Sequence, residues 1–130
     1  MTQLDLIILV EDSPIDVFIH KKVIEQQGLS SNIISYPTAN LALEFLENLK
    51  DNNAIPSLIF LDIRMPDLDG FDFLERFEAL PSNITGKSRI IMLSSSIDES
   101  DLLKARSNKF VLAFIPKPLT KEKLEELFGQ

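Results

Sequence analysis

The sequence predicts an α/β protein built as a doubly wound, five-stranded parallel sheet with helices on both faces. Short apolar runs alternate with helical patterns five times along the 130 residues. The runs are nearly continuous in Ile, Leu and Val, which is typical of strands buried on both faces. Alternation of strand and helix gives a parallel sheet, with right-handed crossovers between the strands. We find no repeat or linker and expect one domain over residues 1–130.

The strands are expected at 6–10, 33–36, 58–62, 89–93 and 111–115. The first helix follows the possible caps Asp12 and Ser13, tolerates Pro14 in its first turn and stops at Gly28. Its apolar stripe includes Phe18, and His20 is expected on its surface. The other segments are a second helix capped by Thr38 and ended by 51–53, a third over 71–77, a polar loop over 81–87, a fourth helix over 98–108, and a fifth capped by Thr120.

Composition narrows the function classes. The net charge of −7 argues against non-specific binding to nucleic acid or to anionic membranes, because both require a basic surface. The chain has no cysteine, which excludes disulfides and thiolate metal sites. No apolar run is long enough to span a bilayer, and the first run lacks the basic flank of a signal peptide. We therefore expect a cytoplasmic protein.

Polar side chains follow four of the five predicted strands. Glu11 and Asp12 end the first strand, Asp62 the third, Ser94 the fourth and Lys117 the fifth. Each alone also fits a cap, a turn or a solvated side chain. Together they meet at one edge of a parallel sheet, where three carboxylates require a cation or a proton. Oxygen ligands without His or Cys indicate Mg²⁺.

These groups are the parts needed for phosphoryl transfer. An aspartate carboxylate can attack phosphorus and form an acyl phosphate. Asp62 is central and is the best nucleophile, whereas Glu11 and Asp12 are better placed as metal ligands. Lys117 lies between two prolines, which restrict its backbone, and the Lys117–Pro118 bond can adopt the cis form. The ammonium and the Ser94 hydroxyl would contact the anionic oxygens of the phosphoryl group.

The pattern resembles the receiver domain of two-component response regulators over essentially the whole chain. The residues that carry this resemblance are Glu11-Asp12, Asp62 followed by Met65-Pro66 and Gly70, Ser94, and Lys117-Pro118. The resemblance implies a flavodoxin/CheY-like three-layer sandwich with strand order 2-1-3-4-5. It also implies a phosphoprotein that acts in a phosphorelay rather than an enzyme on a separate substrate.

The resemblance implies a role for each matching position. Asp62 matches the phosphoacceptor, Asp12 the direct Mg²⁺ ligand, and Glu11 the acid that usually reaches the metal through water. Asp62 is also expected to be a ligand of the metal, and the backbone carbonyl of Arg64 matches the third protein ligand of that metal. Lys117 matches the lysine that pairs with the phosphoryl group.

Further positions match the switch and the residues that tune it. Ser94 matches the switch hydroxyl and Phe114 the switch aromatic, here without a hydroxyl. Arg64 and Ser96 occupy the variable positions that tune the lifetime of the phosphoryl group. We hypothesise that the long cationic side chain of Arg64 shields the acyl phosphate from water.

The implied partners are a sensor histidine kinase or histidine phosphotransfer protein, and a downstream protein. The downstream protein is expected on the face formed by the fourth helix, fifth strand and fifth helix. The residues expected on that face are Leu102, Leu103, Lys104, Arg106, Phe114 and Lys121.

Three alternatives stay open at this point. A phosphatase with an aspartyl-phosphate intermediate commonly carries a second acid two residues after its nucleophile, where this chain has Arg64. A flavin-binding electron carrier requires a phosphate-cradling loop after the first strand, where Glu11 and Asp12 would repel phosphate. The sequence is also consistent with a receiver cut from a larger regulator.

Overall fold

The computed structural model describes residues 4–50, 54–96 and 98–129. Its centre is a five-stranded parallel sheet in the order β2-β1-β3-β4-β5, as predicted. The bounds of the strands are β1 Ile7–Val10, β2 Ile33–Tyr36, β3 Leu58–Asp62, β4 Arg89–Ser94 and β5 Val111–Pro116.

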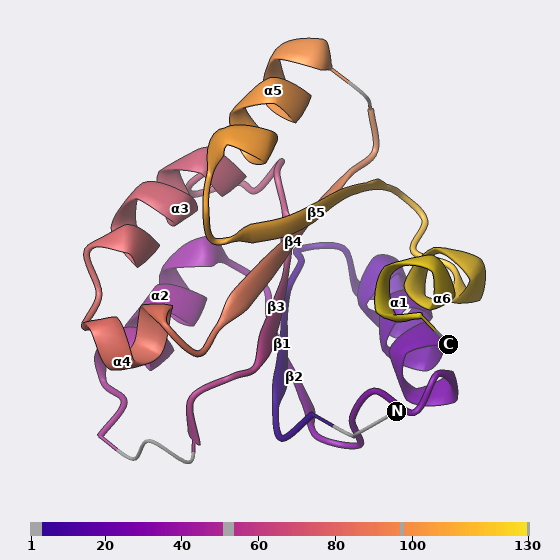
Figure 1. The fold of residues 1–130 in the computed structure, drawn as a ribbon, viewed down its shortest axis with the longest axis horizontal. Coiled ribbons are helices and arrows are strands. Elements are labelled where there is room, and N and C mark those ends of the chain that lie inside the picture. The colour runs from indigo at the N-terminus through magenta and orange to yellow at the C-terminus, as the bar shows by residue number, and fades with distance from the viewer. Residues whose placement is uncertain (1–3, 51–53, 97, 130) are drawn as a thin grey trace.

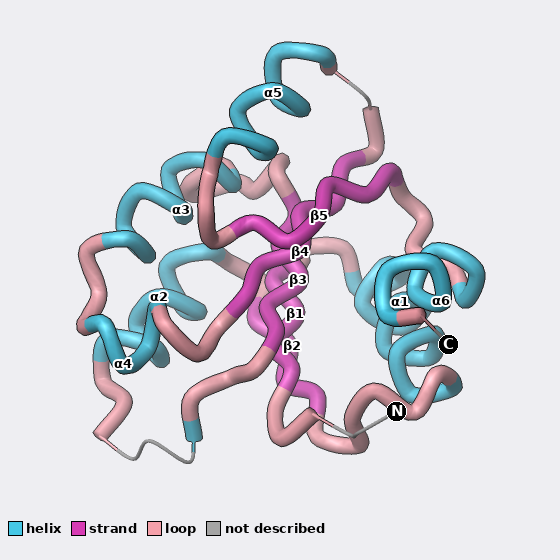
Figure 2. Tube along the Cα trace, in the orientation of Figure 1, coloured by secondary structure: helices cyan, strands magenta, loops and turns pink. Residues whose placement is uncertain are grey.

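Helices form a layer on each side of the sheet. Helices α1 and α6 lie together on one side, and α2, α3, α4 and α5 lie on the other (Figures 1 and 2). Their bounds are α1 Pro14–Gln26, α2 Ala39–Glu47, α3 Gly70–Glu78, α4 Ser82–Thr85, α5 Glu99–Ser107 and α6 Lys121–Phe128. None of the helices among the described residues is long and apolar enough to cross a bilayer.

The short helix α4 corrects the expectation of a polar loop over 81–87. Pro81 precedes it, and the Pro81 carbonyl accepts hydrogen bonds from the backbone N–H groups of Ile84 and Thr85. The turn closes because the Ile84 side chain is buried in the core beside α3. The helix called the fourth in the sequence prediction is therefore α5, and the fifth is α6.

The sheet separates two apolar clusters, because successive side chains of a strand point to opposite faces. In the three central strands, the apolar side chains on both faces are buried. This explains why apolar and polar residues do not alternate along these strands. The cluster beside α2, α3 and α5 contains Ile8, Val10, Ile59, Leu61, Ile90 and Met92, and the cluster beside α1 and α6 contains Ile7, Leu9, Leu58, Phe60, Ile91 and Leu93.

Two predictions about α1 are wrong. The sequence predicts Phe18 on the apolar stripe, but its side chain is 67% exposed. It predicts His20 on the surface, but His20 is 1% exposed. The helix is rotated so that His20 and Ile24, one turn apart, face α6 and the sheet. Gly28 ends the α1 segment as predicted, with the positive φ of 69° that glycine adopts without strain.

Helix α2 is shorter than expected. It begins after Thr38, whose hydroxyl accepts the backbone N–H of Leu41, but it ends at Glu47. The residues 51–53 predicted to end it lie outside the described part of the chain. The predicted caps of two other helices are confirmed: Ser13 caps α1, and Thr120 caps α6.

The segment between β3 and α3 is fixed at both ends, which positions the end of β3. Asp67 accepts the backbone N–H groups of Ala39 and Asn40 at 3.2 and 2.8 Å, so it caps α2 from a distant part of the chain. Burial acts to raise the pKa of Asp67, but these backbone hydrogen bonds prevail and lower it. Gly70 begins α3 so close to β3 that an added Cβ would lie 3.0 Å from Ile63 Cα.

Candidate functional site

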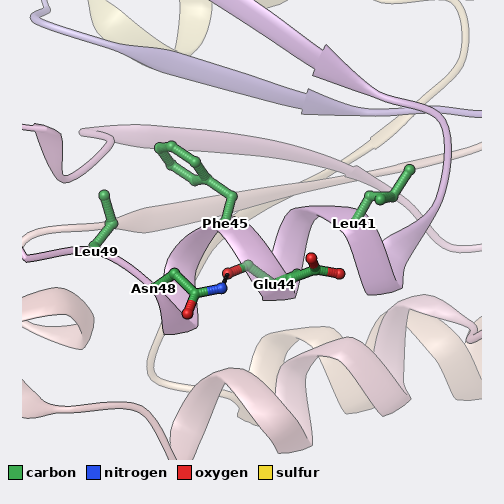
Figure 3. A pocket seen from close by; sticks show the side chains of 5 residues that line it. All are labelled: Leu41, Glu44, Phe45, Asn48 and Leu49. Carbon is green, nitrogen blue, oxygen red and sulfur yellow. Dashed lines mark hydrogen bonds between the residues drawn. The ribbon is translucent and has the colours of Figure 1, made fainter.

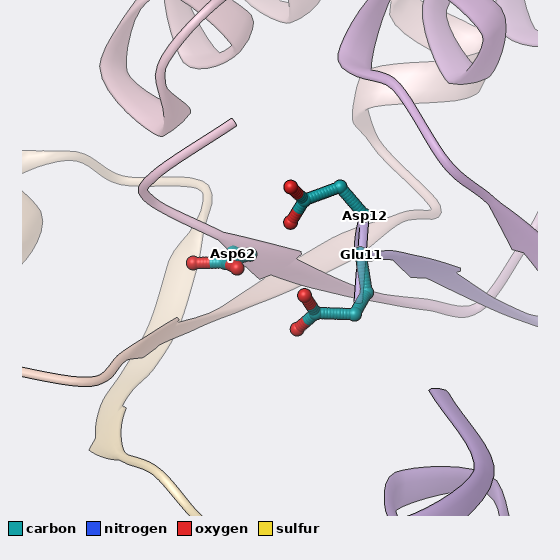
Figure 4. A group of neighbouring side chains, drawn as sticks. All are labelled: Glu11, Asp12 and Asp62. Carbon is teal, nitrogen blue, oxygen red and sulfur yellow. The ribbon is translucent and has the colours of Figure 1, made fainter. Parts of the chain in front are cut away.

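The carboxyl ends of β1 and β3 bring three carboxylates together. Oxygens of Glu11, Asp12 and Asp62 all lie within 4.8 Å of one another. Figure 4 shows these side chains facing one another across the two strand ends. Glu11 and Asp62 are buried, whereas Asp12 is exposed. The cluster arises because β1 and β3 pair in parallel, with Val10 beside Leu61.

Lys117 reaches this cluster from the end of β5. Its Nζ lies 2.8 Å from Glu11 Oε1, 2.8 Å from Asp62 Oδ2 and 3.0 Å from Asp16 Oδ2. The Lys117 side chain is only 13% exposed. Its backbone N–H donates to the Ser94 carbonyl at 2.7 Å, and the Lys117–Pro118 peptide bond is cis. The ammonium donates hydrogen bonds to Asp16 and Asp62, whereas its contact with Glu11 Oε1 is an ion pair without a hydrogen bond.

The pKa values of Glu11 and Lys117 show how burial and charge act in the site. Burial raises the pKa of Glu11 to about 7, although the nearby Lys117 ammonium and the hydrogen bond from the Ser13 N–H act to lower it. Burial acts to lower the pKa of Lys117, but the carboxylates of Asp62, Glu11 and Asp16 outweigh it and raise that pKa. The ammonium is therefore a fixed positive charge within an excess of negative charge.

Both oxygens of Asp62 are hydrogen-bonded. Oδ2 accepts from Lys117, and Oδ1 accepts the backbone N–H of Arg64 at 3.0 Å. The Arg64 guanidinium points elsewhere: it is 62% exposed and lies 3.6 Å from Asp101 on α5. Arg64 thus connects the end of β3 to α5 through its side chain, while its backbone orients Asp62.

The hydroxyl of Ser94 is engaged within its own loop. Ser94 Oγ donates to the Ser96 carbonyl and accepts the Ser96 N–H at 3.2 Å. Ser94 is buried at the end of β4, one residue beyond Leu93, which pairs with Asp62. Phe114 lies on β5 beside Met92, half-buried, and packs against the cluster on the α3 side.

Asp16 is a residue of the site that the sequence interpretation missed. It lies in the first turn of α1, and its backbone N–H donates to the Ser13 hydroxyl at 3.3 Å. The Ser13-Pro14-Ile15-Asp16 spacing was visible, but a Ser followed three residues later by an acid is a usual helix-capping signature. Only the fold shows that the Asp16 carboxylate reaches Lys117.

The donor set fits a hard divalent cation. Glu11, Asp12 and Asp62 offer carboxylate oxygens, and within the described ranges no other group of three His, Cys, Asp or Glu side chains gathers in this way. Mg²⁺ prefers oxygen ligands and is commonly held by one or two carboxylates. Arg64, whose backbone carbonyl is predicted as a further ligand, also donates its backbone N–H to Asp62 Oδ1.

The residues of the predicted partner face lie on α5, β5 and α6. Leu103 is 60% exposed, and Lys104 lies 5.2 Å from the centre of the Phe71 ring on α3. Lys121 lies 3.9 Å from Glu125, one turn along α6. Leu102 is half-buried and Arg106 is exposed on α5, and the role of this face stays a prediction.

A hollow on the outer side of α2 lies apart from these residues. It is lined by Leu41, Glu44, Phe45, Asn48 and Leu49. Figure 3 shows the Asn48 side chain directed back to the Glu44 carbonyl, which accepts its amide at 2.8 Å. Its single ionisable side chain is Glu44, so the hollow lacks the set of groups found at the strand ends.

Comparisons with known proteins agree with the geometry of the site. Residues 7–128 match the family model described as the response regulator receiver domain. A probable methanogenesis regulatory protein, FilR2 of Methanothrix harundinacea, is 28% identical over 127 residues, covering 92% of this chain and 76% of the relative. The sensor histidine kinase CheAY of Helicobacter pylori is 28% identical over 125 residues, which is 92% of this chain but 14% of that protein.

Solved structures show the same arrangement. The crystal structure of a two-component response regulator from Cytophaga hutchinsonii superposes with a TM-score of 0.89 at 30% identity, covering 98% of this chain and 96% of that one. This likeness extends over nearly the whole chain and includes every strand that contributes to the site.

Proposed function

Because the chain belongs to the response regulator receiver domain family, we propose that it accepts a phosphoryl group on Asp62 with Mg²⁺ and thereby switches its partner-binding surface. Receiver domains are signalling modules that act with histidine kinases and downstream effectors. The observation that carries the proposal is the placement of Asp62: its carboxylate is buried, lies beside two other acids and contacts the Lys117 ammonium at 2.8 Å.

In the proposed reaction a carboxylate oxygen of Asp62 forms a bond to phosphorus while the bond between phosphorus and the donor breaks. The donor keeps the electron pair of the broken bond, and the product is an acyl phosphate. Lys117 stabilises the phosphoryl oxygens because its ammonium is already held against Asp62. Glu11, Asp12, Asp62 and the Arg64 carbonyl would hold Mg²⁺, whose positive charge would neutralise the transferring group.

Phosphorylation adds negative charge beside Ser94 and Lys117. We expect the Ser94 hydroxyl to leave the Ser96 carbonyl and to donate to the phosphoryl group. The loop after β4 would then move, and Phe114 would turn into the space that becomes free. This changes the face formed by α5, β5 and α6, and a local charge becomes a change in partner surface.

The proposed phosphodonor is a sensor histidine kinase or a histidine phosphotransfer protein, and the proposed reader is a protein that binds the α5-β5-α6 face. A cytoplasmic location stays a prediction from sequence. The phosphatase alternative is disfavoured because the residue two positions after Asp62 is Arg64, whose side chain pairs with Asp101.

Incubation with Mg²⁺ and acetyl phosphate, followed by intact mass measurement, tests the proposal. We expect the mass of one phosphoryl group to be added, and both a chelator and Asp62→Asn to abolish the adduct. Asp72→Asn is the matched control, because Asp72 is an exposed aspartate on α3 outside the carboxylate cluster. Absence of an adduct, or an adduct that persists in Asp62→Asn, contradicts the proposal.

A further inference from the structure

Helix α1 presents two polar side chains, one turn apart, to the segment that carries Lys117. Asp16 Oδ2 contacts Lys117 Nζ at 3.0 Å. His20 Nε2 accepts the backbone N–H of Leu119 at 3.4 Å. Residues four apart on a helix lie on the same face. One residue therefore binds the side chain of the lysine, and the other binds the backbone two residues further on.

His20 has no evident packing reason to be a histidine. It is 1% exposed, and its neighbours Ile24 and Leu119 belong to the apolar cluster under α1 and α6. Burial lowers the pKa of His20, which favours the neutral ring. A neutral ring that accepts at Nε2 carries its proton on Nδ1, which has no partner within the described chain. Burying a polar ring with one nitrogen unpaired costs free energy. The hydrogen bond that its other nitrogen accepts is therefore the reason we assign for a histidine at this position.

Asp16 differs from the other two carboxylates around Lys117. Glu11 and Asp62 both belong to the cluster that fits a metal ion, whereas Asp16 does not. When metal and phosphoryl group occupy that cluster, the charges facing the ammonium from Glu11 and Asp62 change. The contact with Asp16 is the one that can persist unchanged through the reaction.

We propose that Asp16 and His20 are positioning residues that hold Lys117 from both ends, by its ammonium and by the backbone after it, for phosphoryl transfer to Asp62. This inference rests on the proposed function. It assigns α1 a part in the reaction besides its packing against the sheet, because an ammonium misplaced by about 1 Å stabilises the transferring group far less well.

The test measures the rate of phosphorylation of the full chain by acetyl phosphate at saturating Mg²⁺. We expect Asp16→Ala and His20→Leu each to lower the rate by at least about fivefold. His20→Gln, which keeps a side-chain acceptor for the Leu119 N–H, should recover most of the rate. In a Lys117→Met background, Asp16→Ala should change the residual rate less than about twofold, because the aspartate acts through the lysine.

Glu25→Ala is the matched control, since it removes the same charge from an exposed position of α1 and should leave the rate unchanged. Asp16 is only half-buried, so Asp16→Ala keeps the test decisive if His20→Leu does not fold. Wild-type rates in Asp16→Ala and His20→Leu, or an equal loss in Glu25→Ala, overturn the positioning role alone. A wild-type chain that takes no phosphoryl group overturns this role and the proposed function together.

Discussion

Replacing Asp12 with asparagine is expected to stabilise the protein in chelator and to make it less stable than the wild type in Mg²⁺. Asp12 is exposed, and within residues 4–50, 54–96 and 98–129 no group donates a hydrogen bond to its carboxylate. Its oxygens lie within 4.8 Å of those of Glu11 and Asp62. Without a cation, its charge mainly repels its neighbours.

The size of the effect follows from Coulomb's law. Two unit charges 4.8 Å apart repel by about 0.9 kcal/mol at the dielectric constant of water and about 3.5 kcal/mol at an effective value of 20. The lower figure applies because Asp12 is exposed, and attraction to Lys117 offsets part of the two repulsions. We therefore expect Asp12→Asn to gain about 1 kcal/mol in chelator, or about 4 °C in Tm.

Mg²⁺ should reverse the order of stability of the wild type and Asp12→Asn. At a hundredfold excess over its dissociation constant a bound ion stabilises the wild type by about 2.7 kcal/mol. If loss of the Asp12 carboxylate weakens binding tenfold, the variant gains about 1.4 kcal/mol, and the wild type becomes the more stable protein. Thermal unfolding in chelator and in Mg²⁺ measures both gains, with Glu25→Gln as an exposed control that should follow the wild type.

Either of two results would refute this reasoning. If Asp12→Asn is less stable than the wild type in chelator, the Asp12 carboxylate stabilises the fold and the repulsion is not the governing effect. If Mg²⁺ stabilises the wild type and the variant equally, Asp12 does not take part in holding the ion.

Further outcomes are expected for the titration of Glu11 and for three substitutions. Mg²⁺ affinity, measured by titration calorimetry, should rise with pH up to about 7, because burial raises the pKa of Glu11 to about 7 and the ion must displace its proton. The free energy of unfolding in chelator should change with pH in the opposite direction to Mg²⁺ affinity. The stabilising contribution of Glu11 is fully present below pH 4.5 and is lost as pH rises through about 7. Asp67→Ala should lower the free energy of unfolding by about 1 kcal/mol, as for other helix caps, with Asp72→Ala as the comparison. Gly70→Ala should lower it by about 1–3 kcal/mol in denaturant unfolding, since its Cβ would press on the backbone of Ile63. Arg64→Ala should speed loss of the phosphoryl group after donor removal, and an unchanged decay rate would discard the shielding role.

The sequence predicted most of the fold because the central strands are buried on both faces. Their continuous apolar runs have few other interpretations, and the polar residues that follow four of the five runs mark the carboxyl edge of the sheet. Family resemblance then supplied the strand order, which the structure confirms. The exposed half of α1 was predicted less well. Phe18 and His20 exchanged their expected environments, because a helix with both apolar and polar residues around its circumference does not specify which face turns inward.

The set of strand-end groups follows from the sequence alone: three acids, a hydroxyl and a lysine, each located directly after an apolar run. How these groups are connected depends on the tertiary structure. The fold places Asp16 on Lys117 and His20 on the backbone of Leu119, and it turns the Arg64 side chain to Asp101 rather than to Asp62. These contacts could not be predicted because they join residues far apart in sequence. Their formation depends on how α1, α5 and the β5–α6 connection pack against the sheet, which no local spacing encodes.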